Sequence, residues 1–327
     1  MRQATIRDVA ARAKVSVASV SRALNGHENV HPETRQRVMA AVEALHYVPN
    51  AAARSLSTAL THSIGVVVPD LHGEFFSELI RGMDEAAGEA GYLLLLSTMH
   101  ADPALAGQAI NAMRGRVDGL ILMAPQLPPA LLDRLVPAGM ATVQVNTPEN
   151  AQRTTIGIDN AAGARAVADH LVAAGRRRPL HIAGPVGNFD ASERREAFAE
   201  HLHAQGITPV ECTGAFDDSS GARLVGEMID RGVPFDCIFA ANDMMAIGAM
   251  QELRARGIDV PGKVAVVGFD DVPLAQYLGL TTVAVHVADI GRRAVQALVA
   301  SFGERPPPPR FIKLAPSLMV RASSECS

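Results

Sequence analysis

The sequence predicts an α/β protein, with a small all-α unit at the N-terminus followed by a two-lobed core built on parallel sheets. Three short segments within residues 1–46 carry apolar residues at helical spacing. From Ser63 onward, short apolar strands such as Ile64-Gly65-Val66-Val67-Val68 alternate with helical segments. The alternation comes in two successive series, which indicates two α/β lobes of similar size.

The strands of the first series are expected at residues 64–68, 92–96, 119–122 and 141–145, with a helix over about 75–90. Those of the second series are expected at residues 180–183, 210–214, 237–240 and 264–267. A last strand pair follows the prolines at 306–309. Open α/β sheets bind ligands beyond the carboxyl ends of their strands, so we expect a ligand cleft between the lobes.

Composition and charge narrow the class of protein. The chain has 327 residues, 48% of them hydrophobic, and lacks both a membrane-spanning apolar run and a signal-peptide pattern. Its three cysteines are too few and too far apart for a disulfide framework. Residues 1–60 hold eight Lys and Arg against four Asp and Glu, whereas the whole chain has a formal net charge of −4. We expect a cytoplasmic protein, without membrane contact, whose basic N-terminal unit meets phosphates.

Residues 16–25 predict a short amphipathic helix. Val17, Val20 and Leu24 form its apolar stripe, and the Ser16 hydroxyl can cap its first turn. The opposite face carries Ala18, Ser19, Ser21 and Arg22. A preceding stripe is formed by Ile6, Val9, Ala10 and Ala13. Two short helices joined by a tight turn are typical of helix-turn-helix DNA readers, although periodicity alone fits any small helical hairpin equally well.

The identity of the residues favours DNA binding. The motifs in question are Thr5-Ile6-Arg7-Asp8-Val9-Ala10, Val15-Ser16, Val20-Ser21-Arg22, Leu24-Asn25, Pro32-Glu33-Thr34-Arg35 and Tyr47-Val48-Pro49-Asn50. In this order they closely resemble the N-terminal headpiece of the lactose-repressor (LacI/GalR) family. Where that family usually has a serine as the cap of the third helix, this chain has His31.

The resemblance implies a transcription regulator, expected to be a repressor, that binds a palindromic DNA operator as a homodimer. It implies a helix-turn-helix headpiece over residues 1–49, a hinge helix and linker over 50–61, and an effector-binding and dimerisation core over 62–327. The family core resembles a periplasmic sugar-binding protein, with chain crossings that would fall here near Ile158, His286 and Pro316. The first lobe would span about 62–158 and 286–316, and the second about 159–285 and 317–327.

DNA contacts are expected from both the headpiece and the hinge. Val17 and Ala18 can contact thymine methyl groups, and Arg22 can bond guanine O6 and N7. The family resemblance places Leu56 at a central C–G step, as a wedge in the minor groove. The residues expected to contact DNA are Thr5, Ser16, Val17, Ala18, Ser19, Ser21, Arg22, Asn25, Asn50, Arg54 and Leu56.

A second group of residues resembles the effector contacts of the family. All of these residues lie near the expected carboxyl ends of strands: Asp70, Phe75, Asn146, Asp190, Arg194, Phe216, Asn242 and Asp270. Each could instead be a helix cap or a turn residue. Together, two aromatic rings with an Asn/Asp/Arg set predict a carbohydrate effector. The acidic residues around Arg194 leave no surplus positive charge, which disfavours a phosphorylated one.

Two motifs that suggest enzymes lack the required context. His27-Glu28-Asn29-Val30-His31 matches the HExxH zinc motif, but it lies in an expected loop that Pro32 ends. Residues 257–263 resemble a phosphate loop without its Ser or Thr, and they lie after a helix and before a strand. We therefore expect no enzyme activity, no metal and no cofactor. The alternative function is a sugar-binding receptor without a DNA role.

Overall fold

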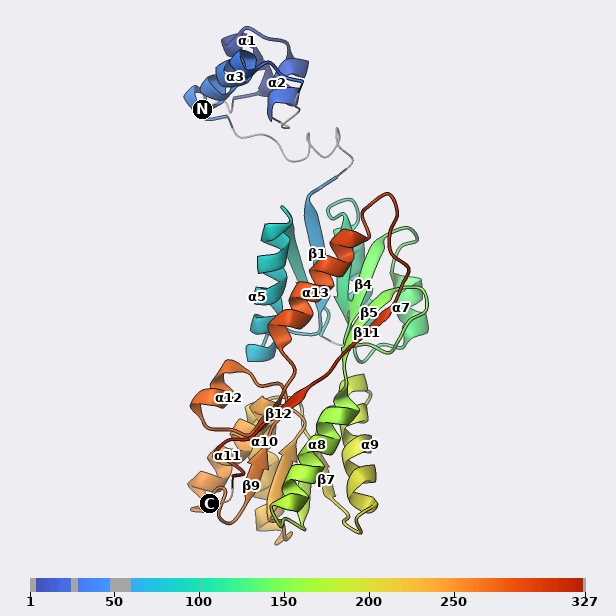
Figure 1. Ribbon diagram of the computed structural model, residues 1–327, viewed down its shortest axis with the longest axis vertical. Helices are drawn as coiled ribbons and strands as arrows, with labels where there is room; N and C mark the ends of the chain where they lie inside the picture. The colour runs from blue at the N-terminus through green and yellow to red at the C-terminus, as the bar shows by residue number, and fades with distance from the viewer. Residues whose placement is uncertain (1–3, 25–28, 48–59, 101, 326–327) are drawn as a thin grey trace. The chain divides into compact units, whose positions relative to one another are not determined.

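The computed structural model describes residues 4–24, 29–47, 60–100 and 102–325 (Figure 1). The chain divides into two compact units, residues 1–61 and residues 62–327, and each unit is described by itself. In the described part of the chain, no helix is both long enough and apolar enough to cross a membrane.

The N-terminal unit contains three helices, α1 (Ile6–Ala13), α2 (Val17–Leu24) and α3 (Pro32–Ala44). Thr5 and Asp8 form a capping box at the start of α1, because each side chain accepts from the other residue's backbone N–H. The backbone N–H of Ser19 donates to Ser16 Oγ at 3.1 Å, which confirms Ser16 as the cap of α2. The helices enclose a small core made of Val9, Ala10, Ala13, Val20, Ala23, Val38 and Ala41.

Two details of this unit bear on the sequence predictions. Of the apolar stripe expected on α2, Val20 is buried and Leu24 is half-buried, whereas Val17 is 41% exposed, which leaves its side chain accessible for the thymine contact expected of it. His31 is the residue before α3, and its side chain makes no capping hydrogen bond. This agrees with the replacement here of the serine that usually caps this helix in the family.

The first lobe contains one parallel sheet of six strands in the order β11-β5-β4-β3-β1-β2. The strands are β1 (Ser63–Val68), β2 (Leu93–Thr98), β3 (Gly119–Met123), β4 (Ala141–Val145), β5 (Thr154–Ile158) and β11 (Phe311–Leu314). Ile64, Val66 and Val68 pack in one hydrophobic cluster with α5 (Glu74–Glu89) and α13 (Val287–Ala300). Val67 joins the cluster on the other face, with α6 (Pro103–Met113) and α7 (Pro129–Leu135).

The second lobe contains a parallel sheet of four strands in the order β7-β6-β8-β9. The strands are β6 (Pro179–Ala183), β7 (Val210–Thr213), β8 (Cys237–Ala240) and β9 (Ala265–Val267). The helices are α8 (Asn160–Ala173), α9 (Phe189–His203), α10 (Asp218–Asp230), α11 (Asp243–Ala255) and α12 (Pro273–Tyr277). A separate antiparallel pair is formed by β10 (Thr282–Ala284) and β12 (Ser317–Met319).

All eight strands expected in the two series are present, with ends shifted by a few residues. The last two strands do not pair with each other, because β11 joins the six-stranded sheet and β12 pairs with β10. The chain passes between the sheets three times: from β5 to α8, from β10 to α13, and from β11 to β12 (Figure 1).

Helices α5 and α13 approach closely in the first lobe because glycine lies at their contact. A Cβ atom at Gly82 would overlap the carbonyl oxygen of Ala288, and one at Gly291 would overlap that of Leu79. Both contacts are with backbone atoms, which cannot move away as a side-chain end can. This pairing fixes the position of α5, whose first turn reaches the cleft.

We expect Gly82→Ala to lower the free energy of unfolding by about 1–3 kcal/mol, the usual cost of overpacking a core. Gly88→Ala on the same helix is the matched control, because a Cβ there meets open space. That variant should be neutral or more stable, by up to about 1 kcal/mol, through helix propensity. Urea unfolding measures both, and equal effects would show that the close approach does not limit packing.

Candidate effector-binding cleft and DNA-reading helix

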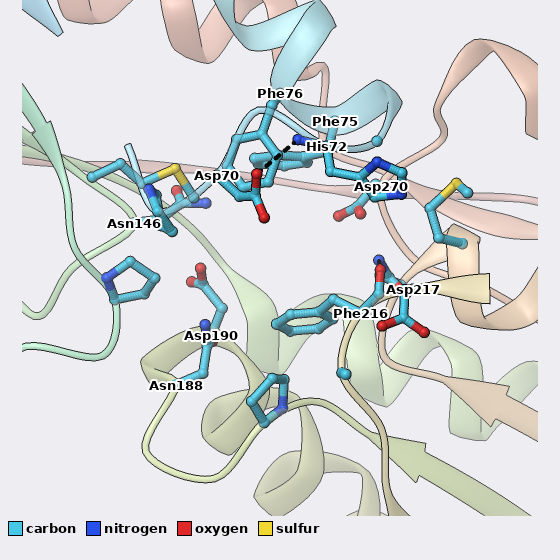
Figure 2. Close-up of a pocket in the computed structure, with 18 of the residues that line it drawn as sticks. Asp70, His72, Phe75, Phe76, Asn146, Asn188, Asp190, Phe216, Asp217 and Asp270 are labelled. Carbon is cyan, nitrogen blue, oxygen red and sulfur yellow. Dashed lines mark hydrogen bonds between the residues drawn. The ribbon is translucent and has the colours of Figure 1, made fainter. Parts of the chain in front are cut away.

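A cavity of about 370 Å³ lies between the two lobes of the core, and Figure 2 shows its lining. All eight residues expected to contact an effector line it: Asp70, Phe75, Asn146, Asp190, Arg194, Phe216, Asn242 and Asp270. The structure therefore brings the predicted set together, and the role of each residue as a ligand contact stays a prediction. His72, His100, Gln126 and Asp217 also line the cavity, although the sequence alone did not single them out.

The ends of the strands deliver these side chains to the cleft. Asp70 follows β1, Asn146 follows β4, and Asp270 follows β9, whereas Arg194 lies one turn into α9. Asn146 has a φ of 49° and Asp270 a φ of 122°, which non-glycine residues rarely adopt. Asp270 is held there by its backbone N–H, which donates to the Val283 carbonyl at 2.9 Å. Strained backbone of this kind is concentrated at functional sites.

The guanidinium of Arg194 organises the floor of the cavity. Its side chain is only 4% exposed, its Nε donates to Asn160 Oδ1 at 2.8 Å, and its Nη1 donates to the Ala241 carbonyl at 2.6 Å. Nη1 also lies 3.7 Å from Asp270 Oδ1, and Cζ lies 3.8 Å from the centre of the Phe269 ring. None of these contacts uses Nη2, which leaves this group for a ligand in the cavity.

Asn160 belongs to the hydrogen-bond network beneath the cavity, and the sequence predictions missed it. It is fully buried at the first position of α8, and its Nδ2 donates to Asp190 Oδ1 at 2.8 Å and to Glu193 Oε2 at 3.0 Å. Its Oδ1 accepts from Arg194. One amide side chain thus bonds both the carboxyl group of Asp190 and the guanidinium of Arg194. The strand before it, β5, was not recognised in the sequence, and so its carboxyl end was not searched.

The buried acids of the cleft hold their protons more tightly than exposed acids do. Burial raises the pKa of Asp190 from 3.8 to about 6, although the nearby Arg194 opposes the change. Burial also raises the pKa of Asp270, again against the charge of Arg194. The pKa of Asp243, beneath Asp270, is raised by burial and by the Asp270 charge. The guanidinium of Arg194 opposes the effect of burial at Asp190 and Asp270 but does not outweigh it.

The raised pKa of Asp190 predicts a pH dependence of stability. Between pH 3.8 and about 6 the folded protein binds more protons at Asp190 than the unfolded chain does, so this contribution to stability is lost as pH rises. The unfolding free energy of the wild type minus that of Asp190→Asn should fall across this window, by on the order of 2 kcal/mol. Burial lowers the pKa of His181 to about 4, with the opposite sign, but His181 is common to both proteins. Parallel urea-unfolding curves against pH would contradict the prediction.

The exposed side of α2 carries most of the residues expected to read DNA. Ser16, Val17, Ala18 and Arg22 are exposed, as is Thr5, whereas Ser19 and Ser21 are half-buried. Four residues predicted to contact DNA lie outside the described residues: Asn25, Asn50, Arg54 and Leu56. His27 and Glu28 of the HExxH match also lie outside them. Among the described residues, no group of three or more His, Cys, Asp or Glu is placed to hold a metal ion.

Comparison with known proteins decides the family. Residues 5–50 match the bacterial regulatory proteins of the lacI family, and residues 168–324 match a periplasmic binding protein-like domain. The GalR transcriptional regulator of Escherichia coli is 33% identical over 98% of this chain and 95% of its own length. The chain belongs to the LacI family. The ribose operon repressor of Halalkalibacterium halodurans is 31% identical, over 98% of this chain and 97% of that protein.

Solved structures agree with the expected fold of a LacI-family protein. The lac repressor dimer bound to operator and the anti-inducer ONPF has a TM-score of 0.91 at 26% identity, covering 99% of this chain and all of that one. A complex of the regulator CelR with cellobiose has a TM-score of 0.74 at 31% identity, covering 98% of this chain and all of that one. The predicted fold class and family are confirmed. This LacI-family protein is a DNA-binding transcription regulator and not an enzyme, and the receptor alternative is set aside.

Proposed function

We propose that this LacI-family regulator is a repressor whose affinity for a palindromic operator is controlled by a neutral sugar in the cleft. The observation that carries the proposal is the pairing of aromatic walls with a polar floor whose guanidinium is already compensated by acids. Because the regulator acts on the genome, we propose a cytoplasmic location.

The lining of the cleft fits a sugar better than an anion. Phe75 and Phe216 face the cavity from the two lobes (Figure 2) and can stack on the apolar faces of a sugar ring. Asp70, Asp190 and Asp270 can accept from sugar hydroxyls. A phosphate would meet these carboxyl groups, and one of them, Asp270, already lies 3.7 Å from the guanidinium of Arg194. Relatives named for the ribose operon and solved with cellobiose support a sugar effector.

The effector is tested by thermal-shift measurements of the full chain with D-ribose, D-galactose and cellobiose. A sugar at 100 times its dissociation constant stabilises the folded protein by about 2.7 kcal/mol. If Arg194 anchors the sugar, Arg194→Ala should weaken binding about tenfold or more, because hydrogen bonds to charged groups are worth about 1.5–3 kcal/mol.

Arg195→Ala is the matched control, because Arg195 pairs with Glu196 at the surface. Operator binding without sugar should stay near normal in both variants and serves as the check on folding. Unchanged sugar affinity in Arg194→Ala, measured by calorimetry, would remove Arg194 from the site.

The first lobe offers an edge that a second copy of the chain can cover. Strand β2 is the last strand of the six-stranded sheet, and Leu93 on it is 72% exposed. Leu95 and Leu96 on the same strand are also exposed. An exposed apolar edge strand favours association, and the lac repressor structure is that of a dimer. We therefore propose a homodimer, which suits a palindromic operator because operator symmetry mirrors protein symmetry.

DNA reading is tested at Arg22, which is exposed on α2. If Arg22 bonds guanine O6 and N7, Arg22→Ala should cost about 1–3 kcal/mol and relax the preference at that base pair. The measurement is selection of sites from a random DNA pool by the wild type and the variant, with an inverted repeat and a central CG expected for the wild type.

Arg7→Ala is the control, because a phosphate contact at Arg7 would weaken binding to all sequences alike and reduce the salt dependence. Recovery of the same consensus by the wild type and Arg22→Ala would show that Arg22 does not read a base.

A further inference from the structure

Two backbone amides of the second lobe donate hydrogen bonds across the cleft to the first lobe, apart from the three chain crossings. The backbone N–H of Leu274 donates to Glu74 Oε2 at 2.8 Å. The backbone N–H of Phe189 donates to the Pro125 carbonyl at 3.0 Å. These bonds hold the two lobes together around the cavity at two separate points.

The Glu74 bond lies at the rim of the cavity. Glu74 begins α5, directly before Phe75 and Phe76, which line the cavity. Leu274 comes two residues after Val272, which also lines it. The bond therefore ties the helix that carries Phe75 to the first turn of α12, which follows the loop that carries Asp270. Phe75 and Asp270 lie on the same side of the cavity in Figure 2.

Phe75 shows what closure of the lobes buries. Its half-buried ring belongs to the first lobe, yet it packs against the hydrophobic cluster of the second lobe, which contains Met245, Val272 and Ala275. Separation of the lobes would expose this apolar contact. Gly73, at the start of α5, also lies close to Met244 of the second lobe.

The two bonds differ in how the sequence specifies them. The Pro125–Phe189 bond is between backbone atoms and forms whichever side chains are present, provided that the donor is not proline. The Glu74 bond needs a side chain of this length with an acceptor oxygen. Hydrogen bonds that involve a charged group are also stronger than neutral ones. Of these two bonds, the Glu74 bond is therefore the one that a change of side chain can remove.

We propose that Glu74 is a positioning residue of the effector site, which holds the lobes closed on the cavity before an effector binds. A cleft that binds its ligand only when closed has an apparent affinity set by its closed fraction. Loss of the bond lowers the closed fraction and therefore lowers the apparent affinity for the effector. The consequence for effector affinity rests on the proposed function, whereas closure itself does not.

The test compares Glu74→Ala, Glu74→Gln and Glu78→Ala in the full-length protein without any sugar. Glu78→Ala is the matched control, because Glu78 is on the same helix and bonds Arg81 within the first lobe. Hydrogen exchange of two backbone amides is followed by NMR after labelling with ¹⁵N-leucine and ¹⁵N-phenylalanine. The amide of Leu274 reports the Glu74 bond, and that of Phe189 reports the other cross-cleft bond.

We expect Glu74→Ala to speed exchange at both amides and Glu78→Ala to change neither. Glu74→Gln keeps an acceptor oxygen and should restore most of the protection. Faster exchange at Leu274 alone would overturn the proposal, because the bond would then be local and without effect on closure. No change at either amide would overturn it as well.

The sugar that stabilises the wild type is then titrated by calorimetry. Its dissociation constant should rise about tenfold in Glu74→Ala, the effect of about 1.4 kcal/mol, and stay unchanged in Glu78→Ala. An unchanged constant in Glu74→Ala would overturn the positioning role. If D-ribose, D-galactose and cellobiose all fail to bind the wild type, the proposed effector class is wrong, while the two amides still decide whether Glu74 closes the cleft.

Discussion

Burial of the Arg194 guanidinium is the constraint on which the cleft depends. A charge removed from water is tolerated only when it is paired and hydrogen-bonded, and Arg194 satisfies this through groups from several parts of the second lobe. Asn160 comes from the start of α8, the Ala241 carbonyl follows β8, and Asp270 follows β9. One side chain therefore fixes the relative positions of segments that are far apart in the sequence, and the carboxylates around it are tolerated because it is present.

The same network reaches the segments that connect the lobes. Asn160 bonds Arg194 and follows Asp159, which caps α8. The backbone N–H of Asp159 donates to the Leu314 carbonyl at 2.9 Å, and Asp159 Oδ1 lies 3.1 Å from Lys313 Nζ on β11. The floor of the cleft is thus in continuous contact with two of the three crossings. An effector can shift the arrangement of the lobes only if it binds the alternative arrangements unequally, and this floor is where such a difference would act.

The sequence revealed those parts of the site that follow from local pattern. Asp70, Asn146 and Asp270 were identifiable because they resemble the family's effector contacts and lie within three residues of the ends of strands that the sequence predicts. Asn160 was missed because β5, with its two threonines and a glycine, does not read as a buried strand. Glu74 was missed because its partner, Leu274, is 200 residues away. Val17 belongs to the apolar stripe of α2 and is nevertheless exposed, because helical periodicity gives a stripe but does not say how far the neighbouring helices cover it.

The three crossings between the lobes are short. Only Asp159 separates β5 from α8, only Val285 and His286 separate β10 from α13, and only Ala315 and Pro316 separate β11 from β12. Connections of one or two residues leave no slack for sliding, so the lobes can tilt about these connections but cannot translate past each other. Strand β1 ends at the cleft and begins at Ser63 at the opposite end of the sheet, about 17 Å away at the usual rise per residue. A tilt of a few degrees at the crossings is therefore enlarged by this lever into a sideways displacement of Ser63, the residue from which the chain leads back to the DNA-reading unit.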